Sequence, residues 1–426
     1  MAELEMLQES KRESTGTSQT DLLIAIPAPL GGDVLSSTIA KIGQACRLLS
    51  TPCQATLALP GEAAREDATD LVGMDPSDPT APALRFVNYP PPPADPGAIP
   101  WLANAGAYRT ISALAGKLGV RACTVLGMDI GLNVESLTAE KLMLLLDPAL
   151  EGGFDLVMPL YATQAFDDLV NKSILYPLAT TLYGHRVRNP LGNEFQMSSK
   201  LFPALSTEAQ NPMRQQGRLP WPATIAANRS LKICQVRLGT RRPTGSDGIE
   251  LSDALAQLAG PLFLDMEDNA AFWQRIRGSH EVPTFGNSEA SADNPDTVDV
   301  RRMLEAFHLG VGNLREIWSL ILPPVTLLEL KKLSSLPPDE FHMEDSLWAR
   351  IIYDFALAHR LRNIHRAHLF GALTPLYLGW LASYAVDINR SGIATAQERI
   401  EQLARTYESE KPYLLSRWRW PDRFHP

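Results

Sequence analysis

The chain has 426 residues, of which 45% are hydrophobic, and a formal net charge of −9. This apolar content is enough for a sizeable core, and the length predicts two domains or one domain with a large appendage. The acidic balance gives no broad basic field, so nucleic acid is not an expected partner. The four cysteines form no CxxC pair, which is typical of reduced thiols in a cytoplasmic protein.

In chain order, the first feature is a polar segment at residues 1–19, which lacks the apolar run of a signal peptide. We expect a disordered tail there. Strands are then predicted at 21–26, 54–61, 83–90, 122–129 and 154–161, and helices at 33–49, 106–119 and 138–150. Such alternation predicts a mostly parallel α/β sheet, which binds ligands at the carboxyl ends of its strands. Pro27, Ala28, Asp129 and Tyr161 lie at such ends.

The second half of the chain changes character. Residues 171–184 predict a helix, residues 185–198 a loop that is first basic and then contains glycine, and residues 232–241 a strand that runs into Arg241 and Arg242. From residue 251 onward, apolar residues recur at helical spacing, interrupted by a polar loop at 278–296. We therefore predict an α/β domain over residues 20–248 and a helical C-terminal domain over 249–426.

One segment has the length and composition of a membrane span. Residues 369–386, "LFGALTPLYLGWLASYAV", are free of charge over eighteen positions. They contain Pro375 and two tyrosines, and their flanks have the charge pattern of soluble helices. We therefore expect no transmembrane segment, and predict that this stretch packs inside the helical domain against Trp348, Ile352 and Phe355.

A resemblance to a known family rests on several stretches in a shared order. They are "LLIAIPA", "GAYRTISALAGKLGVRACTVLGMD", "LEGGFDLVMPLY", "NKSILYPLATTLYGHRVRNPLGNEFQMS", "TIAANRSLKICQVRLGTR" and "WARIIYDFALAH" followed by "HLFGALTPLYLGWLASY". Together they resemble a bacterial group of GT-A glycosyltransferases, of the family-2 type and similar to glucosyl- and mannosyl-3-phosphoglycerate synthases. The resemblance implies a GT-A nucleotide-sugar domain over residues 20–248.

The chain departs from this family where the chemistry is done. The family's strand end reads Asp-x-Asp, whereas this chain has "GMD", with Gly127 in place of the first aspartate. The family's Pro-Gly-Lys-Gly helix start is "LANAGAYR" here, which keeps Gly106 and has Arg109 but no lysine. A histidine that usually follows the "QVxLG" strand is absent, and the acidic "GGDF/GGEF" loop survives as "GNEF".

The resemblance also implies site residues. Asp129 matches the second carboxylate of a metal pair, so Mg²⁺ or Mn²⁺ would be weakly bound; the alternative for Asp129 is a turn or helix-capping residue. The residues implied for the sugar nucleotide are Pro27, Ala28, Gly106, Arg109, Asp129, Arg241 and Arg242. Those implied for the acceptor are Arg186, Arg188, Gly192, Asn193 and Glu194.

Glu194 is the candidate catalytic carboxylate. It would be the general base of an inverting enzyme, whereas a retaining front-face reaction needs no protein base; the alternative is a structural loop acid. For Arg109, Arg186 and Arg188, the alternative interpretation is an ordinary surface residue that contacts no ligand. His365 and His368, three apart, could face one another on a helix, but no further ligand accompanies them at a metal-binding spacing.

The resemblance, together with the departures from it, implies two functions. The first is a cytoplasmic glycosyltransferase that moves a hexose from a nucleotide-diphosphate sugar to a small polar acceptor, of the phosphoglycerate or glycerate type. The second is a catalytically lapsed relative that acts as a sugar-nucleotide binder or partner subunit, favoured by the missing aspartate, lysine and histidine. A homodimer is left open.

Overall fold

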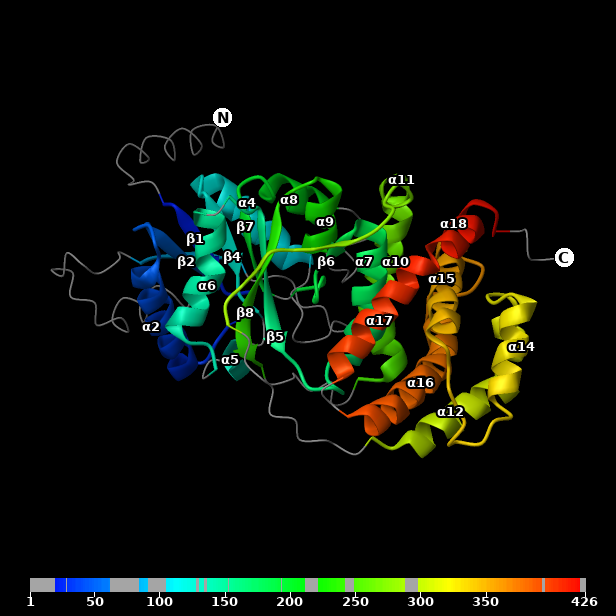
Figure 1. Cartoon of the computed structure of the whole chain (residues 1–426). Coiled ribbons are helices and arrows are strands. Elements are labelled where there is room, and N and C mark those ends of the chain that lie inside the picture. Colours follow the sequence, from blue (N-terminus) through cyan, green and yellow to red (C-terminus); the bar gives the residue numbers. More distant parts are fainter. Residues whose placement is uncertain are drawn as a thin grey trace.

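The computed structural model describes residues 20–27, 29–61, 84–90, 105–127, 130–133, 136–151, 153–192, 194–210, 221–241, 249–287, 298–392 and 395–421. The expected tail at 1–19 lies outside this part of the chain. Two bodies of secondary structure lie side by side (Figure 1), a sheet flanked by helices and a group of C-terminal helices. The α/β class with C-terminal helices is therefore confirmed.

The sheet of the described chain has eight strands in the order β10-β8-β5-β7-β4-β1-β2-β3. Every pair is parallel except those of β7, which runs antiparallel to both β4 and β5. Their bounds are β1 (Leu22–Ala25), β2 (Ala55–Pro60), β3 (Arg85–Tyr89), β4 (Ala122–Val125), β5 (Leu156–Ala162), β7 (Phe195–Ser198), β8 (Ile233–Thr240) and β10 (Thr284–Phe285).

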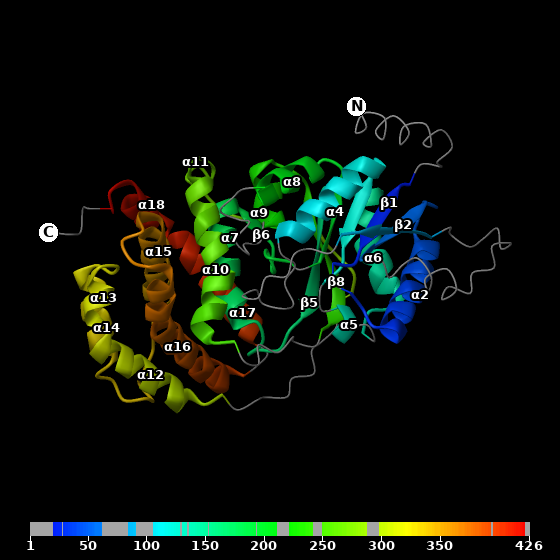
Figure 2. The same cartoon turned by 180° about the vertical axis from the view of Figure 1, so that it is seen from behind.

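The central strands are buried on both faces because helices cover both sides of the sheet. β1 and β4 are apolar or nearly so throughout and are fully buried, the pattern of a covered parallel sheet. One face packs on α2 (Gly32–Leu48) and α6 (Ala139–Leu150). The other face packs on α4 (Ala105–Leu118), α8 (Phe202–Gln210) and α9 (Pro222–Asn228), as Figure 2 shows from behind.

The strand order contains a topological switch point. From β1 the chain goes to β2 and β3 on one side and then returns to place β4 on the other side of β1. In open α/β sheets, ligands bind in the crevice outside the carboxyl ends of the strands at such a point. Buried Pro27 follows β1 there, and Gly127 follows β4. The predicted strands at 21–26, 122–129 and 154–161 are confirmed as parts of one sheet.

The segment 185–198 corrects one prediction. It is not only a loop, because it contains the two-residue β6 (His185–Arg186) and the buried β7. β6 pairs with β9 (His280–Glu281) in a small second sheet, and β7 is inserted into the main one. Four residues, "FQMS", are too short to show a periodic pattern, so neighbouring strands rather than local sequence decide that β7 is extended.

The C-terminal region is helical, as predicted. Its helices are α10 (Leu251–Asp268), α11 (Ala270–Trp273), α12 (Val300–Asn313), α13 (Arg315–Ser319), α14 (Pro324–Leu333), α15 (Asp345–Leu361), α16 (Arg366–Ser391), α17 (Ala396–Ser409) and α18 (Lys411–Arg419). They share one hydrophobic core with the sheet. The junction is a π-helical turn, Asn171–Leu175, continued by α7 (Tyr176–Tyr183).

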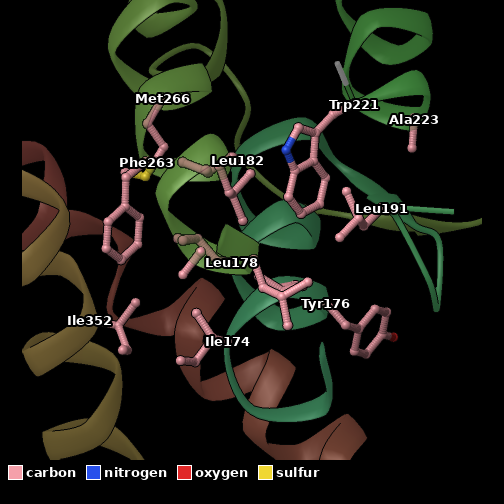
Figure 3. Close-up of a cluster of buried hydrophobic side chains, with 14 of the residues drawn as sticks. Ile174, Tyr176, Leu178, Leu182, Leu191, Trp221, Ala223, Phe263, Met266 and Ile352 are labelled. Atoms are coloured by element: carbon pink, nitrogen blue, oxygen red, sulfur yellow. The ribbon is translucent and has the colours of Figure 1, made fainter. Parts of the chain in front are cut away.

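Figure 3 shows how this junction is packed. Ile174, Leu178 and Leu182 project from the π turn and α7. Phe263 and Met266 of α10 and Ile352 of α15 meet them, while Trp221 closes the side toward the sheet. All of these side chains are buried. Because one continuous core joins the two bodies, we expect them to unfold together.

Helix α16 contains the charge-free stretch. Among the helices of the described chain, α16 is long and apolar enough to cross a membrane, judged by length and composition alone. However, 78% of its apolar window is buried inside the structure. Trp380 stacks on Trp348 of α15 with ring centroids 5.9 Å apart, and Trp318 of α13 donates its indole N–H to the Ala372 carbonyl. The predicted burial of this stretch among the C-terminal helices, with Trp348 as a partner, is therefore confirmed.

A close approach of α12 and α16 generates the first prediction. A Cβ atom at Gly379 would lie 2.8 Å from Phe307 Cδ2 and 3.1 Å from Met343 Cε, whereas one at Gly371 of the same helix meets nothing within 4 Å. Gly379→Ala should destabilise the protein by about 1–3 kcal/mol through overpacking. Gly371→Ala, the matched control, should be neutral or stabilise it by about 0.5–1 kcal/mol, because alanine favours the helix. Denaturant unfolding measures both; equal effects would contradict the close approach.

The second prediction concerns Lys411, whose ammonium donates to the carbonyls of Thr181 (2.7 Å) and Ile276 (2.8 Å). Burial lowers the pKa of Lys411 to about 8. Between that value and the ordinary 10.5, the unfolded chain holds the proton and the native chain does not, so stability contributed by this residue rises with pH. The unfolding free energy of wild type minus that of Lys411→Met should grow by about 1–2 kcal/mol from pH 7.5 to pH 9.5. A difference that stays flat would show that Lys411 is not desolvated.

Candidate functional site

Three strand ends meet at one edge of the sheet. β5 and β8 run parallel and end at Ala162 and Thr240, while antiparallel β7 starts at Phe195 at the same edge. The antiparallel direction of β7 brings Glu194 close to Tyr161 and Arg241. A register shift between Leu160 and Tyr161 interrupts the β5–β8 ladder just before the site. Irregularities of this kind re-aim side chains and are common beside functional sites.

Glu194 is the centre of this cluster. Arg241 Nη1 lies 2.8 Å from Glu194 Oε1, and the Tyr161 hydroxyl donates to the same oxygen. The Arg241 guanidinium also lies over the Tyr161 ring, 4.9 Å from its centroid. Glu194 is 3% exposed, whereas the Arg241 side chain is 17% exposed. A buried carboxylate is therefore held by a cation that still reaches solvent.

The chain after β4 closes the other side of the cluster. A small pocket of about 10 Å³, room for about one water molecule, is lined by Tyr161, Glu194 and Arg241 together with Ile130, Asn133, Ser136, Leu137 and Leu238. Ile130 begins α5 (Ile130–Asn133) and donates its N–H to the Gly127 carbonyl. Ala28, Asp129, Asn193 and Arg242 lie outside the described residues.

Two further residues that were predicted for the sugar nucleotide lie on α4. Gly106 is in its first turn, and Arg109 is exposed one turn along. The neighbouring Tyr108 packs edge-on against Phe195, with ring centroids 5.5 Å apart. Because Phe195 directly follows Glu194, this contact fixes the start of α4 beside the start of β7. The structure thus brings Arg109 to the same edge without showing a contact to Glu194.

The arginines predicted for the acceptor lie elsewhere, in an ion-pair cluster with Glu401 of α17. Arg188 Nη2 is 2.7 Å from one Glu401 oxygen, and Arg186 Nη1 is 3.5 Å from the other. Arg186 also reaches Glu281 at 3.3 Å. Tyr176 donates to Glu401 at 2.6 Å, and burial raises the pKa of this tyrosine well above its ordinary value, so it stays a donor. Both arginines are therefore engaged by a carboxylate of the helical region.

Gly192 has a packing reason of its own. A Cβ at this position would overlap Met158 Cε of β5 and lie 3.3 Å from the Glu194 carbonyl oxygen. The glycine therefore lets the "LGNEF" segment pass close over β5 before β7 begins. Its position beside Glu194 is confirmed, whereas its role toward an acceptor stays a prediction.

The side chains of the described residues do not form a ligand set that suits a divalent cation. No group of three or more His, Cys, Asp or Glu side chains gathers there at metal-binding distances. The rings of His365 and His368 lie 5.9 Å apart, and neither they nor Glu194, which is bound to Arg241 and Tyr161, belongs to such a group. Hard cations need several oxygen ligands, so one carboxylate is a poor site.

Sequence reasoning missed two members of these clusters. Tyr161 was recognised as a strand end but not as a partner of Glu194, because the register shift that turns it toward β7 has no sequence signal. Glu401 lies in an amphipathic helix whose charged face looks like ordinary solvated surface. Only the packing of α17 on α7 places its carboxylate between two arginines.

No protein-family model matches the chain, and no curated protein matches it. Among solved structures, glucosyl-3-phosphoglycerate synthase from Mycobacterium tuberculosis, in complex with Mn²⁺, UDP-glucose and phosphoglyceric acid, is similar at 16% identity over 61% of this chain and 82% of that one, with a TM-score of 0.34. Mannosyl-3-phosphoglycerate synthase from Rubrobacter xylanophilus is similar at 13% identity over 63% and 80%, with a TM-score of 0.32. TM-scores this low do not establish a shared fold, and the function proposed for this chain does not rest on them.

The third prediction tests the Glu194–Arg241 pair by a double-mutant cycle. Arg241→Gln should destabilise the protein by about 3 kcal/mol or more, because it leaves a buried carboxylate without its cation. Glu194→Gln should cost less, because Arg241 still reaches water. The coupling should be about 1.5–3 kcal/mol, the range of a hydrogen bond to a charged group.

Chemical denaturation of the two single variants and the double variant gives this coupling. Arg237→Gln is the matched control, since Arg237 is on the same strand and, among the described residues, its guanidinium has one hydrogen bond, to the Gly286 carbonyl at 3.4 Å. It should change the unfolding free energy by less than about 1 kcal/mol. A coupling near zero for Glu194 and Arg241 would mean that the pair is not formed in solution.

Proposed function

We propose that the chain is a glycosyltransferase of GT-A type that moves a hexose from a nucleotide-diphosphate sugar to a small polar acceptor. The observation that carries the proposal is the cluster of Tyr161, Glu194 and Arg241 at the carboxyl edge of a mostly parallel sheet, near the switch point between β1 and β4. It combines a buried carboxylate with a partly exposed cation at the edge where such sheets bind ligands. The sequence resemblance to GT-A enzymes adds the substrate class.

The sugar nucleotide would lie across this edge. Its nucleoside would contact Pro27 and Ala28 at the end of β1, and its diphosphate would face Arg241, Arg242 and Arg109. Arginine offers a planar set of donors that suits phosphate oxygens. Arg241 is suited to this role because its guanidinium is already positioned by Glu194 and Tyr161 while part of it reaches solvent.

In the transfer step, an acceptor hydroxyl oxygen bonds to the anomeric carbon as the bond from that carbon to the diphosphate oxygen breaks. The nucleoside diphosphate leaves with the electron pair, and arginine donors stabilise its developing charge. In a retaining front-face reaction the leaving phosphate takes the acceptor proton. In an inverting reaction Glu194 takes it, after its oxygen is released by Arg241 or Tyr161.

No step of this mechanism passes through a metal ion. Mg²⁺ or Mn²⁺ remains a proposal that depends on Asp129, with diphosphate oxygens as further ligands. Because the family's first aspartate is Gly127 here, we infer that the dependence on divalent ion is weak. Arginines then offset the charge that a metal offsets elsewhere.

The acceptor is proposed to be a small phosphoglycerate- or glycerate-like anion. Arg186 and Arg188 support this class only indirectly, because Glu401 already neutralises them. An acceptor phosphate or carboxylate that used them would have to exchange for the Glu401 carboxylate. Arg186 and Arg188 precede Glu194 by a few residues in the same chain segment. Such an exchange would therefore occur close in sequence to the proposed site.

A second function, a lapsed enzyme that only binds a sugar nucleotide or serves as a partner subunit, is favoured by one observation. Arg241 and Tyr161 both bind Oε1 of Glu194, and the pocket beside it has room for about one water molecule. A carboxylate tied in this way is as suitable for stabilising the sheet edge as for taking a proton.

The fourth prediction separates the two functions by a panel of UDP- and GDP-sugars, with and without Mg²⁺ or Mn²⁺. Binding is measured by calorimetry, and donor hydrolysis and transfer by release of nucleoside diphosphate. Arg109→Ala should weaken donor binding roughly ten- to a hundredfold, as expected for loss of one charge-assisted contact to phosphate. Asp129→Ala should have a smaller effect.

The control is Arg301→Ala, which removes an exposed arginine of α12 away from the sheet edge and should leave binding unchanged. Strong metal-dependent turnover that Asp129→Ala abolishes would contradict the arginine-based site. Binding without turnover for every donor and acceptor tried would support the lapsed enzyme. No binding of any sugar nucleotide would reject the transferase and the sugar-nucleotide binder, and would leave the partner subunit.

A further inference from the structure

A second hollow among the described residues lies away from the candidate site. It has a volume of about 450 Å³, within the range of small-molecule sites, and is formed by the end of α7, the α9–β8 turn and the segment after α11. Leu231, on its wall, precedes β8, whereas Arg241 follows the same strand. Eight strand residues span roughly 26 Å, so the hollow and the candidate site lie at opposite ends of β8. We call this hollow the β6–β9 pocket.

The β6–β9 pocket is basic. Its lining includes Arg275, Arg277, His185 and His280, and no aspartate or glutamate. Neither guanidinium has an ion-pair partner within the described ranges. The nearby acids face other groups, since Glu281 pairs with Arg186 and the Asp265 carboxylate accepts from Tyr183. An anion entering the pocket would therefore meet two uncompensated positive charges.

The two histidines add hydrogen-bonding capacity to the pocket. Their rings pack edge to face with centroids 4.4 Å apart, where β6 pairs with β9. Burial, and then the neighbouring His280, lowers the pKa of His185 to about 4, so this ring is neutral at neutral pH. Its Nδ1 is buried and has no hydrogen-bond partner in the part of the chain that the structure describes.

Part of the pocket lining is aromatic. The rings of Tyr183 and Phe272 stack with centroids 5.9 Å apart and an angle of 23° between their planes. Tyr183 is 3% exposed, and Phe272 is half-buried beside it. Ile276 and Leu231 add further apolar side chains to the lining. A ligand that used both features would carry a ring at one end and a negative charge at the other.

The walls are fixed before any ligand arrives. Ile276 is held through its carbonyl by the Lys411 ammonium, and Ser279 Oγ accepts from Arg186 Nε at 2.9 Å. The His280 N–H donates to the Gly184 carbonyl at 3.0 Å. Gly184 has φ +74°, and a Cβ there would lie 3.1 Å from the Gly278 carbonyl oxygen. Preorganised walls of this kind lower the entropy lost on binding.

We propose that the β6–β9 pocket is a binding site for a small ring-bearing anion, a phosphate monoester or a carboxylate, whose charged group binds Arg275 and Arg277 and whose ring rests on Phe272. The site is separate from the sugar-nucleotide site. Its occupancy requires neither donor binding nor transfer.

The probe for this site is phenyl phosphate, which carries both features, compared with inorganic phosphate and phenol, which carry one each. Calorimetric titration of the full chain should show saturable binding of phenyl phosphate, at least tenfold tighter than of either simpler compound. Arg275→Ala and Arg277→Ala should each weaken it at least tenfold, because each removes one charge-assisted contact. Both side chains are exposed, so the variants should fold, which circular dichroism and thermal unfolding check.

Two controls localise the binding. Arg301→Ala removes an exposed arginine of α12 and should leave it unchanged. Arg241→Lys changes the candidate active site at the other end of β8 and should also leave it unchanged. The proposal is overturned if phenyl phosphate does not bind at millimolar concentration, if the Arg275 and Arg277 variants bind it as wild type does, or if Arg241→Lys is the variant that weakens it. Because sugar nucleotides are absent, failure here leaves the proposed transferase unaffected.

Discussion

The direction of β7 is the constraint on which the site depends. Strands β4, β5 and β8 are all parallel, and β7 enters between β4 and β5 from the opposite end. A parallel strand in this position would place its carboxyl end at the ligand edge and Glu194 at the far edge. The antiparallel ladder instead places Glu194 between the ends of β5 and β8, where Tyr161 and Arg241 meet it. Burial of this carboxylate is tolerable only because both partners are present.

The helical C-terminal region does more than extend the core. α17 packs on α7 and brings Glu401 to Arg186 and Arg188, and α18 brings Lys411 to carbonyls of α7 and of the segment after α11. Helix α7, on which these contacts converge, also contributes to the hydrophobic junction of Figure 3. The segment that leads from α7 through β6 to Glu194 is therefore held from the helical side. Changes in the C-terminal helices can be expected to reach the sheet edge through this segment.

Charge is distributed differently at the two pockets. At the sheet edge, the positive charge of Arg241 is balanced by Glu194, so a diphosphate would compete with or share an existing ion pair. At the β6–β9 pocket, the two arginines have no such partner among the described residues, and the neighbouring histidine is neutral. On electrostatic grounds alone, a free anion is expected to enter the β6–β9 pocket more readily than the sheet edge. Anion binding at the two pockets should therefore differ in affinity.

The sequence by itself determined the classes of the main elements, because hydrophobic periodicity is a local property: fully apolar runs became central strands, and the charge-free stretch of α16 became a buried helix. It also determined which chemistry-bearing residues follow strands, such as Arg241. Only the tertiary structure decided that Glu194 meets Arg241 and that Arg186 and Arg188 meet Glu401. Those pairs join residues far apart in the chain, and they form through the direction of a four-residue strand and the docking of a distant helix. Both of these depend on packing between elements, which no local pattern records.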